Sequence, residues 1–293
     1  GIGQYTLSLL TQLSEFRPDY KIIIFHDQKN IKKEIISIIN DKIELYYLSN
    51  LFYPLWEFLL FPIYAFKKKS TIIHFVGNTG FSLIPKMLGI KIYQTIHDAY
   101  FMNPENKFPQ HSNFKQMLGS IYRRYTVPKL AKNADKIFTV SEFAKSELIK
   151  FFQIDKEKLF VTYNTLDKQY FNYMKKIDLS IKEKIILIVS GDHPQKNLSN
   201  TLKFLKKNNR DLFKDWKLII CGKVNDKIKS IVNFDNIFFY EHIDQEKLIM
   251  LYKKSKILIF PSLFESFGLP LIESLSMGLT LISSNKGATR EVA

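Results

Sequence analysis

Cysteine is nearly absent from this chain of 293 residues, which excludes a fold held together by disulfides. The single cysteine, Cys221, lies in the apolar run KLIICGK and has no partner within the chain, which favours a reducing compartment. The six histidines show no close metal-ligand spacing. We therefore expect a cytoplasmic protein, either free in the cytoplasm or at the inner face of the cytoplasmic membrane.

Arginine is also scarce, although the formal net charge is +15. Five arginines stand among 43 basic residues, and the lysines are spread along the whole chain. Specific nucleic-acid surfaces cluster their basic residues and use arginine for bidentate contacts, so the composition argues against nucleic acid as a partner. Attraction to phosphate-bearing substrates or to an anionic membrane surface is the better interpretation.

No uninterrupted apolar run reaches the length of a membrane-spanning helix. The most hydrophobic stretch, residues 51–69, is interrupted by Pro54, Glu57 and Pro62 and ends in three lysines. One interpretation is a buried amphipathic helix with a lysine cap. The other is peripheral membrane contact, with aromatic side chains in the interface and lysines at anionic headgroups.

The chain does contain enough apolar residues for two cores, because 46% of its residues are hydrophobic and 14% are aromatic. Its length also favours two domains over one. Strand-like and helix-like segments alternate from end to end, which is typical of parallel sheets with crossover helices. We predict an α/β protein with two Rossmann-like, doubly wound domains.

A polar, lysine-rich stretch separates two halves of this pattern. We expect a first domain over residues 1–165, a linker over 166–184 and a second domain over 185–293. In the first half the predicted helices cover 6–16, 31–40, 51–66, 112–131 and a segment from 141, and the strands cover 21–25, 43–48, 71–75, 91–96, 136–140 and 159–163. In the second half the predicted strands are 185–191, 216–222, 237–243, 256–260 and 279–283, and the helices are 198–207, 245–255 and 270–277.

The loop after the first strand of the second half carries residues suited to a phosphate. Ligands of open α/β sheets lie beyond the carboxyl ends of the strands. There Gly191 permits a close turn, and Lys196 and Asn197 arrive as a helix begins. The lysine could meet a phosphate as a mobile point charge, or it could be an ordinary solvated lysine at a helix start.

A second strand end precedes the stretch FPSLFESFGLPLIESLSMG. Pro270 suits the first position of a helix, because its missing N–H would go unused there. The amides of Phe267, Gly268 and Leu269 would then form an anion site at the mouth of that helix.

Two glutamates, Glu265 and Glu273, flank this helix mouth. Glu273 in the first helical turn could simply complement the helix dipole. A carboxylate would repel a phosphate in the helix mouth, however, whereas it could accept hydrogen bonds from hydroxyls. A nucleotide sugar offers both groups, with Glu265 on the sugar, Glu273 on the ribose and the amides on the diphosphate.

The spacing Glu265-x7-Glu273 with SFGLP between resembles the E-x7-E signature of the retaining glycosyltransferases of family 4, which have the two-domain GT-B fold. The same resemblance is carried by PQKNL, SNKGATREV, GIGQYT, TIHDAY, ADKIFTVSEFAKSEL and YNTLD, in the right order along the chain. It implies two Rossmann-like domains facing each other across a cleft, a nucleoside-diphosphate sugar as co-substrate and no metal cofactor. The sequence contains no Asp-x-Asp motif to hold a metal.

By this resemblance Glu265 would position the donor sugar, and Lys196 with the helix amides would stabilise the departing diphosphate. Glu273 would fix the ribose. The donor-binding residues would be Gly191, Asn197, Phe267, Gly268, Leu269 and Glu273. No protein nucleophile is assigned.

In the first domain, His97 and the following Asp98 would lie at a strand end near the reacting centre, on the acceptor side. Alternatively, His97 could be bonded to neighbouring backbone. Gly1 and Gly3 would let a loop approach the diphosphate or the acceptor, although a plain turn is an equally simple interpretation.

The implied activity is transfer of a mannosyl- or glucosyl-like hexosyl group to a glycan or lipid-linked saccharide in cell-surface polysaccharide synthesis. A non-catalytic nucleotide-sugar-binding protein is one alternative. A dinucleotide-dependent oxidoreductase or epimerase is another, but the segment Gly1-Ile-Gly3 lacks the third glycine of that fingerprint and no strand precedes it.

Three features depart from the family pattern. Asp192 stands where a basic residue often follows the glycine, and YNTLD lacks the usual glycine after its asparagine. Both ends look cut, since the first strand before Gly1 and the closing elements after Ala293 are not present. We therefore expect a fragment of a longer protein.

Overall fold

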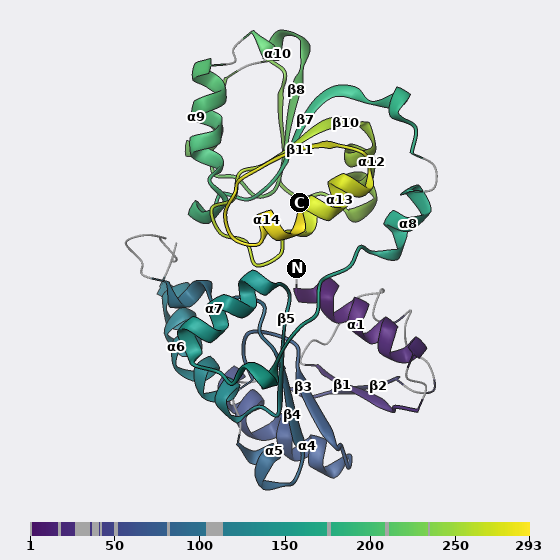
Figure 1. Ribbon diagram of the computed structural model, residues 1–293, viewed down its shortest axis with the longest axis vertical. Coiled ribbons are helices and arrows are strands. Elements are labelled where there is room, and N and C mark those ends of the chain that lie inside the picture. The colour runs from purple at the N-terminus through teal and green to yellow at the C-terminus, as the bar shows by residue number, and fades with distance from the viewer. Residues whose placement is uncertain are drawn as a thin grey trace. The chain divides into compact units, whose positions relative to one another are not determined.

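The computed structural model describes residues 2–16, 19–26, 36, 41, 43–49, 52–80, 83–103, 114–174, 177–208, 211–233 and 235–293. They form two compact units, one made mainly of residues up to Thr165 and the other mainly of residues from Leu166 onward. Figure 1 shows both as α/β structures. The predicted helix over 31–40 lies outside the described residues, apart from residue 36.

The first unit is built on a four-stranded parallel sheet with one face buried in a hydrophobic core. Its strands, in the order β3-β4-β5-β6, are β3 (Ile72–Phe75), β4 (Lys91–Thr95), β5 (Lys136–Thr139) and β6 (Leu159–Val161); β1 (Ile22–His26) and β2 (Ile43–Tyr47) form a separate parallel pair. Ile92 and Ile137 are fully buried in its core, where Leu130 of a covering helix joins them. The buried residues alternate with half-buried ones along β3, β4 and β5, so the apolar runs predicted as strands place one side of each strand in this core.

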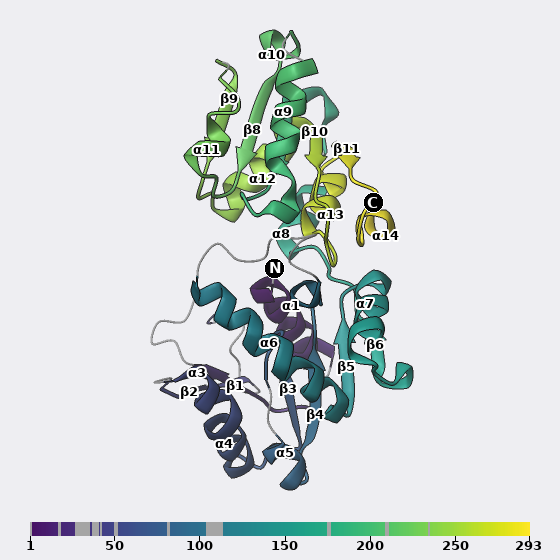
Figure 2. The ribbon, with the colours of Figure 1, turned by 90° about the vertical axis from the view of Figure 1, so that its left-hand side faces the viewer.

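The helices of the first unit cover this sheet. They are α1 (Ile2–Phe16), α3 (Tyr53–Leu55), α4 (Phe61–Lys67), α5 (Ile84–Met87), α6 (Phe114–Asn133) and α7 (Glu142–Phe152), with a π-helix at Trp56–Leu60 and 3-10 turns at Tyr100–Met102 and Lys156–Lys158. Figure 2 shows α6 running along the sheet, consistent with the burial of Val127 and Leu130. None of the helices in the described part of the chain combines the length and hydrophobicity needed to span a membrane.

The second unit is a five-stranded parallel sheet in the order β11-β10-β7-β8-β9. The strands are β7 (Glu183–Val189), β8 (Lys217–Cys221), β9 (Ile237–Tyr240), β10 (Ser255–Phe260) and β11 (Thr280–Ser283). The chain runs from β7 outward to β9 and then crosses back to β10 on the other side of β7. The boundary between β7 and β10 is therefore a topological switch point, where ligands of doubly wound sheets bind.

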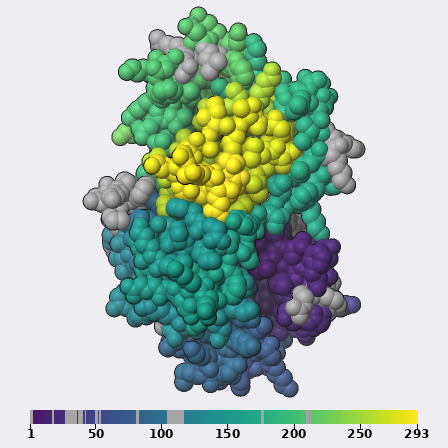
Figure 3. Space-filling model, in the orientation of Figure 1, coloured from purple at the N-terminus to yellow at the C-terminus, as the bar shows by residue number. Residues whose placement is uncertain are grey.

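Helices lie on both faces of this sheet. They are α8 (Lys168–Met174), α9 (Leu198–Asn208), α10 (Leu212–Asp215), α11 (Asp226–Lys229), α12 (Gln245–Lys254), α13 (Leu269–Ser276) and α14 (Thr289–Val292), with 3-10 turns at Leu179–Ile181 and Pro194–Lys196. Successive residues of β7 enter two different cores, with Leu187 in one and Ile186 and Ile188 in the other. In Figure 3 the last elements, from α13 onward (yellow), form one continuous part of this unit's surface.

Part of the stretch expected as a linker belongs to the second unit. Tyr170 of α8 is fully buried and its ring lies 6.3 Å from that of Tyr252 in α12. Leu166 and Tyr173 pack against the same core. Tyr170 and Tyr173 lie three residues apart on one face of α8, a signal masked by the surrounding lysines.

Two glycines provide a matched test of backbone constraint. Gly222, at the end of β8, has φ +140°, and a Cβ there would lie 2.4 Å from the Ser190 carbonyl oxygen. A Cβ at Gly3 in α1 would have no neighbour within 4 Å. We predict that Gly222→Ala lowers the free energy of unfolding by roughly 2–4 kcal/mol.

Gly3→Ala should instead leave that free energy unchanged or raise it by up to about 1 kcal/mol, since alanine favours the helix. Urea unfolding followed by circular dichroism measures both variants. Equal effects of the two substitutions would contradict the close backbone approach at Gly222.

Candidate active site

The loops that follow β7 and β10 meet at the switch point of the second unit. The Leu263 amide donates a hydrogen bond of 2.7 Å to the Gln195 carbonyl. Lys196, the last residue of the adjacent 3-10 turn, donates a hydrogen bond from its ammonium group to Glu265 Oε1. The structure thus brings together two predicted site residues that are 69 positions apart in sequence.

The Lys196–Glu265 pair is sheltered but open to solvent. The lysine side chain is 26% exposed and the glutamate side chain 12%. The Lys196 ammonium has further donors that can reach phosphate oxygens, and a carboxylate accepts several hydrogen bonds. This pair of opposite charges can therefore hold an anionic group beside a hydroxylated one.

Gly287 fixes the backbone of Glu265, a role that the sequence did not indicate. It has φ +65°, and a Cβ there would lie 2.6 Å from the carbonyl oxygen of Glu265 and 2.8 Å from its nitrogen. The next residue, Ala288, donates its amide to the same carbonyl at 2.8 Å. Glycine is required here because the segment SNKGA touches the backbone that carries the acid.

The helix mouth after β10 starts one residue earlier than predicted. Gly268 is the cap in a left-handed conformation with φ +91°, and a Cβ there would lie 3.0 Å from Leu271 Cδ1. Leu269 is the first residue of α13, so Pro270 takes the second position rather than the first. The amides of Gly268 and Leu269 open an eight-residue helix whose dipole favours an anion there. Phe267 is buried beside them.

The same shift moves Glu273 out of the first turn. Its Oε2 accepts a hydrogen bond of 2.9 Å from the hydroxyl of Tyr252, which is fully buried. Burial raises the pKa of Glu273, an effect that the bond from Tyr252 partly opposes. Because dipole interactions fade beyond the first turn, simple dipole compensation is a poor account of this acid.

The remaining donor-side residues shape the loop after β7. Asn197 is left-handed with φ 57°, and its side chain accepts a hydrogen bond of 2.9 Å from Asn200 at the start of α9. A Cβ at Gly191 would lie 3.5 Å from the Lys223 carbonyl. Asp192, the departure from the family pattern, accepts a bond of 2.9 Å from Asn225. The left-handed conformation of Asn197 therefore shapes the path of the chain, whereas a side chain at Gly191 would make only an ordinary contact.

The first unit carries the other predicted constellation, beyond the carboxyl end of β4. His97 Nε2 lies 2.9 Å from the Val76 carbonyl, so that nitrogen carries the proton and Nδ1 keeps a lone pair. Burial lowers the pKa of His97, while the bond to Val76 and the charge of Asp98 oppose this shift. The backbone bond given as an alternative for this histidine is present, and it engages only one of the two ring nitrogens.

Asn78 ties His97 to Asp98, which sequence reasoning missed. Its Oδ1 accepts the His97 amide at 2.7 Å, and its Nδ2 donates to Asp98 Oδ2 at 3.0 Å. Gln94 of β4 holds the same loop by donating to the Gly77 carbonyl at 2.6 Å. The available signals were a polar residue inside an apolar strand and an asparagine beside a glycine.

Helix α1 supports the histidine from the side. The ring of Tyr5 lies edge-on to His97 with centroids 4.8 Å apart, and its hydroxyl is 3.0 Å from Thr95 Oγ1. His74 Nε2 lies 2.8 Å from Thr95 Oγ1 as well, and burial lowers the pKa of His74 to about 4. Gly3 lies in this helix rather than in a loop, because α1 begins at Ile2 and not at residue 6 as predicted. Gly1 lies outside the described residues.

No group of three or more His, Cys, Asp or Glu side chains within the described ranges is placed to hold a metal ion.

Asn78 provides a test of the first-unit constellation. Asn78→Ala would leave the buried His97 amide without its acceptor and would remove the donor to Asp98 Oδ2. We expect a loss of roughly 1–3 kcal/mol in the free energy of unfolding, measured by urea denaturation. Asn133→Ala, which removes an exposed bond to the Lys129 carbonyl, is the control and should change it by less than about 0.5 kcal/mol.

The variant Asn78→Asp separates the two bonds. It keeps an acceptor for the His97 amide but sets a second carboxylate against Asp98. Its loss of unfolding free energy at neutral pH should therefore shrink as the pH falls towards 4, where one of the two acids is protonated. Equal losses for Asn78→Ala and Asn133→Ala would show that Asn78 does not hold the pair.

The pKa of Glu273 makes a separate prediction. A carboxyl group whose pKa is raised on folding keeps its proton in the folded state where the unfolded chain has lost it. Its favourable contribution is therefore present at low pH and is lost as the pH rises through the folded-state pKa. We expect Glu273→Gln, which cannot ionise, to gain stability over the native chain between about pH 4 and pH 7.

Urea midpoints of both chains at several pH values measure this trend. A difference that stays constant, or that moves in favour of the native chain as the pH rises, would contradict the burial of this acid.

Two family models match the chain and together cover it. Residues 1–170 match the one described as Glycosyltransferase Family 4, and residues 169–293 match the one described as Glycosyl transferases group 1. Among curated proteins, the O-antigen chain mannosyltransferase RfbU of Salmonella typhimurium is 28% identical over 180 residues, which are 59% of this chain and 48% of that protein. The chain thus spans about half the length of this relative.

A second relative is the Campylobacter jejuni N-acetylgalactosamine-N,N'-diacetylbacillosaminyl-diphospho-undecaprenol 4-alpha-N-acetylgalactosaminyltransferase. It is 25% identical over 260 residues, which are 82% of this chain and 66% of that protein.

Solved structures share the fold at low sequence identity. The glycosyltransferase from Rickettsia africae ESF-5 has a TM-score of 0.69 at 20% identity, covering 98% of this chain and 77% of that one. Anabaena Alr3699/HepE, solved in complex with UDP, has a TM-score of 0.65 at 13% identity, covering 99% and 79%. These likenesses confirm the predicted GT-B fold class.

Proposed function

Because this chain belongs to the glycosyltransferases of family 4, we propose that the protein transfers a hexosyl group from a nucleoside-diphosphate sugar to a hydroxyl of a glycan or lipid-linked saccharide, with retention of anomeric configuration. The observation that carries the proposal is the Lys196–Glu265 pair at the switch point of the second unit. The similarity to an O-antigen chain mannosyltransferase favours a mannosyl-like donor and a role in cell-surface polysaccharide synthesis.

The donor would be held through its charges and its hydroxyls. The Lys196 ammonium and the amides of Gly268 and Leu269 would receive the diphosphate, whose negative charge grows as the bond to the sugar breaks. Glu265 would accept hydrogen bonds from the sugar hydroxyls. Glu273 would accept those of the ribose, with Tyr252 holding its other oxygen.

On the acceptor side, His97 would present Nδ1 as a hydrogen-bond acceptor for a sugar hydroxyl. Its lowered pKa supports this role, since the neutral ring keeps that lone pair at pH 7. Asp98 and Asn78 would fix its position. The residues named above supply every charge that the proposal uses, so it includes no metal. A reducing, cytoplasmic location fits the lone buried Cys221.

Lys196→Ala and Glu265→Ala test the proposal. Each should lower transfer from the preferred donor by on the order of a hundredfold or more, because each removes a charge from the donor site. Lys203→Ala, an exposed lysine on the neighbouring α9, is the matched control and should retain the native rate. Nucleotide release from UDP-, GDP- and ADP-sugars measures the rate, and NMR of the product reports the anomeric configuration.

Near-native transfer in both variants would contradict the assignment of Lys196 and Glu265 to the donor site. Binding of a sugar nucleotide without any turnover would favour the alternative of a non-catalytic nucleotide-sugar-binding protein. Binding of NAD in preference to every sugar nucleotide would favour the oxidoreductase class instead.

A further inference from the structure

The helical stretch from α3 to α4 turns its acid inward and its apolar residues outward. Glu57 is 2% exposed, and its Oε2 accepts a hydrogen bond of 2.8 Å from the Tyr122 hydroxyl. Phe52, Leu55 and Phe58 are 64%, 47% and 43% exposed. A surface helix of a soluble domain normally shows the opposite arrangement. This inversion separates the stretch from an ordinary amphipathic helix.

Helix α6 continues the exposed apolar surface. Leu118, Ile121 and Tyr125 are 50%, 53% and 70% exposed and recur at the three- and four-residue spacing of one helix face. Tyr122 of the same helix bonds to Glu57, which joins α6 to the buried side of the π-helix. Figure 2 shows α3, α4 and α6 in the same unit. We call this surface the apolar face; it comprises Phe52, Leu55, Phe58, Leu118, Ile121 and Tyr125.

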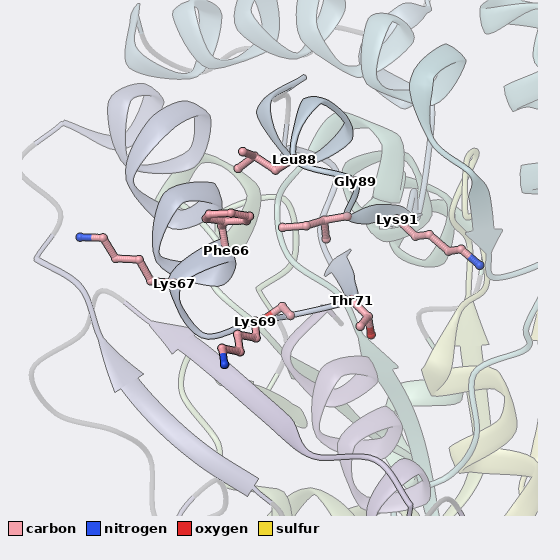
Figure 4. Close-up of a pocket in the computed structure, with 9 residues that line it drawn as sticks. Phe66, Lys67, Lys69, Thr71, Leu88, Gly89 and Lys91 are labelled. Atoms are coloured by element: carbon pink, nitrogen blue, oxygen red, sulfur yellow. The ribbon is translucent and has the colours of Figure 1, made fainter.

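Lysines surround a hollow in the same unit, at the end of α4. Phe66, at the end of α4, is 50% exposed and lines a hollow of about 570 Å³ together with Leu88 and Ile90. Three lysines complete its lining, and no acid does: Lys67, Lys69 and Lys91. In Figure 4 their side chains extend outward from the hollow, whereas Phe66 and Leu88 lie close together inside it. Met87 on the adjoining α5 is 83% exposed.

The charged residues of these elements are almost all basic. Residues 52–69, 83–91 and 114–133 contain three, two and five lysines or arginines, ten in all, and a single acid. That acid is the buried Glu57. Over the whole chain the ratio is 43 bases to 28 acids, so composition alone does not account for this bias.

We propose that the apolar face and its lysine border dock onto a bilayer that contains anionic lipids. Aromatic and aliphatic side chains would enter the interface, and Lys67, Lys69 and Lys91 would meet the headgroup phosphates. A second copy of this chain fits less well, because two surfaces of like charge would repel each other. The inference goes beyond the proposed function, since it would hold equally for a protein that binds a sugar nucleotide without transferring the sugar.

The test is co-sedimentation of the full chain with two kinds of vesicle, one of phosphatidylcholine alone and one that also contains about 30% phosphatidylglycerol. The second kind imitates the charge of an anionic leaflet. We expect binding to the anionic vesicles that weakens with added salt, and little binding to the neutral ones. The double variant Phe58→Ser, Ile121→Ser and the double variant Lys67→Glu, Lys69→Glu should each weaken binding at least about tenfold.

Matched controls come from α9 of the second unit, where Phe204 is 61% exposed among lysines. Phe204→Ser and the double variant Lys203→Glu, Lys206→Glu should bind like the native chain, and circular dichroism confirms that every variant is folded. Equal binding to both vesicle types, no binding, or loss of binding only in the α9 variants would overturn the proposal. So would a dimer in sedimentation velocity that Phe58→Ser, Ile121→Ser dissociates, because the face would then join two copies.

Discussion

The pairing of β7 with β10 is the constraint on which the candidate donor site depends. These strands are neighbours in the sheet, with Ile186 opposite Ile257 and Leu187 opposite Leu258, although some seventy residues separate them along the chain. This pairing sets the loops after the two strands side by side, and the bond from Leu263 to Gln195 joins them. Lys196 and Glu265 meet because the backbone beneath them is fixed. The positive φ of Gly268 and Gly287 and the close approach at each serve the same end.

Burial shifts the pKa of one titratable group in each unit, upward for a carboxyl group and downward for a histidine. Loss of solvation favours the neutral form, so the pKa of Glu273 rises and that of His97 falls. Each group also has well-defined partners, the hydroxyls of Tyr252 and Tyr170 for Glu273 and the Val76 carbonyl for His97 Nε2. These partners fix the orientation of both groups.

The first unit also shows how the burial of one acid changes the character of a surface. Glu57, the acid of the α3–α4 stretch, is buried and accepts a bond from Tyr122. The stretch then exposes no acid of its own, while Phe52, Leu55 and Phe58 remain exposed.

The sequence by itself determined the α/β class, nearly all the strands and the family, because these depend on local hydrophobic alternation and on short motifs such as Glu265-x7-Glu273. Tertiary structure decided which way Glu57 faces, that Asn78 holds His97 and Asp98, that Gly287 supports Glu265, and that α8 joins a core. The start of α13 at Leu269 was likewise set by the fit of Gly268 against Leu271 and Phe260. Most of these features arise from contacts between residues far apart in sequence, and such contacts leave no periodic pattern in the chain that could reveal them.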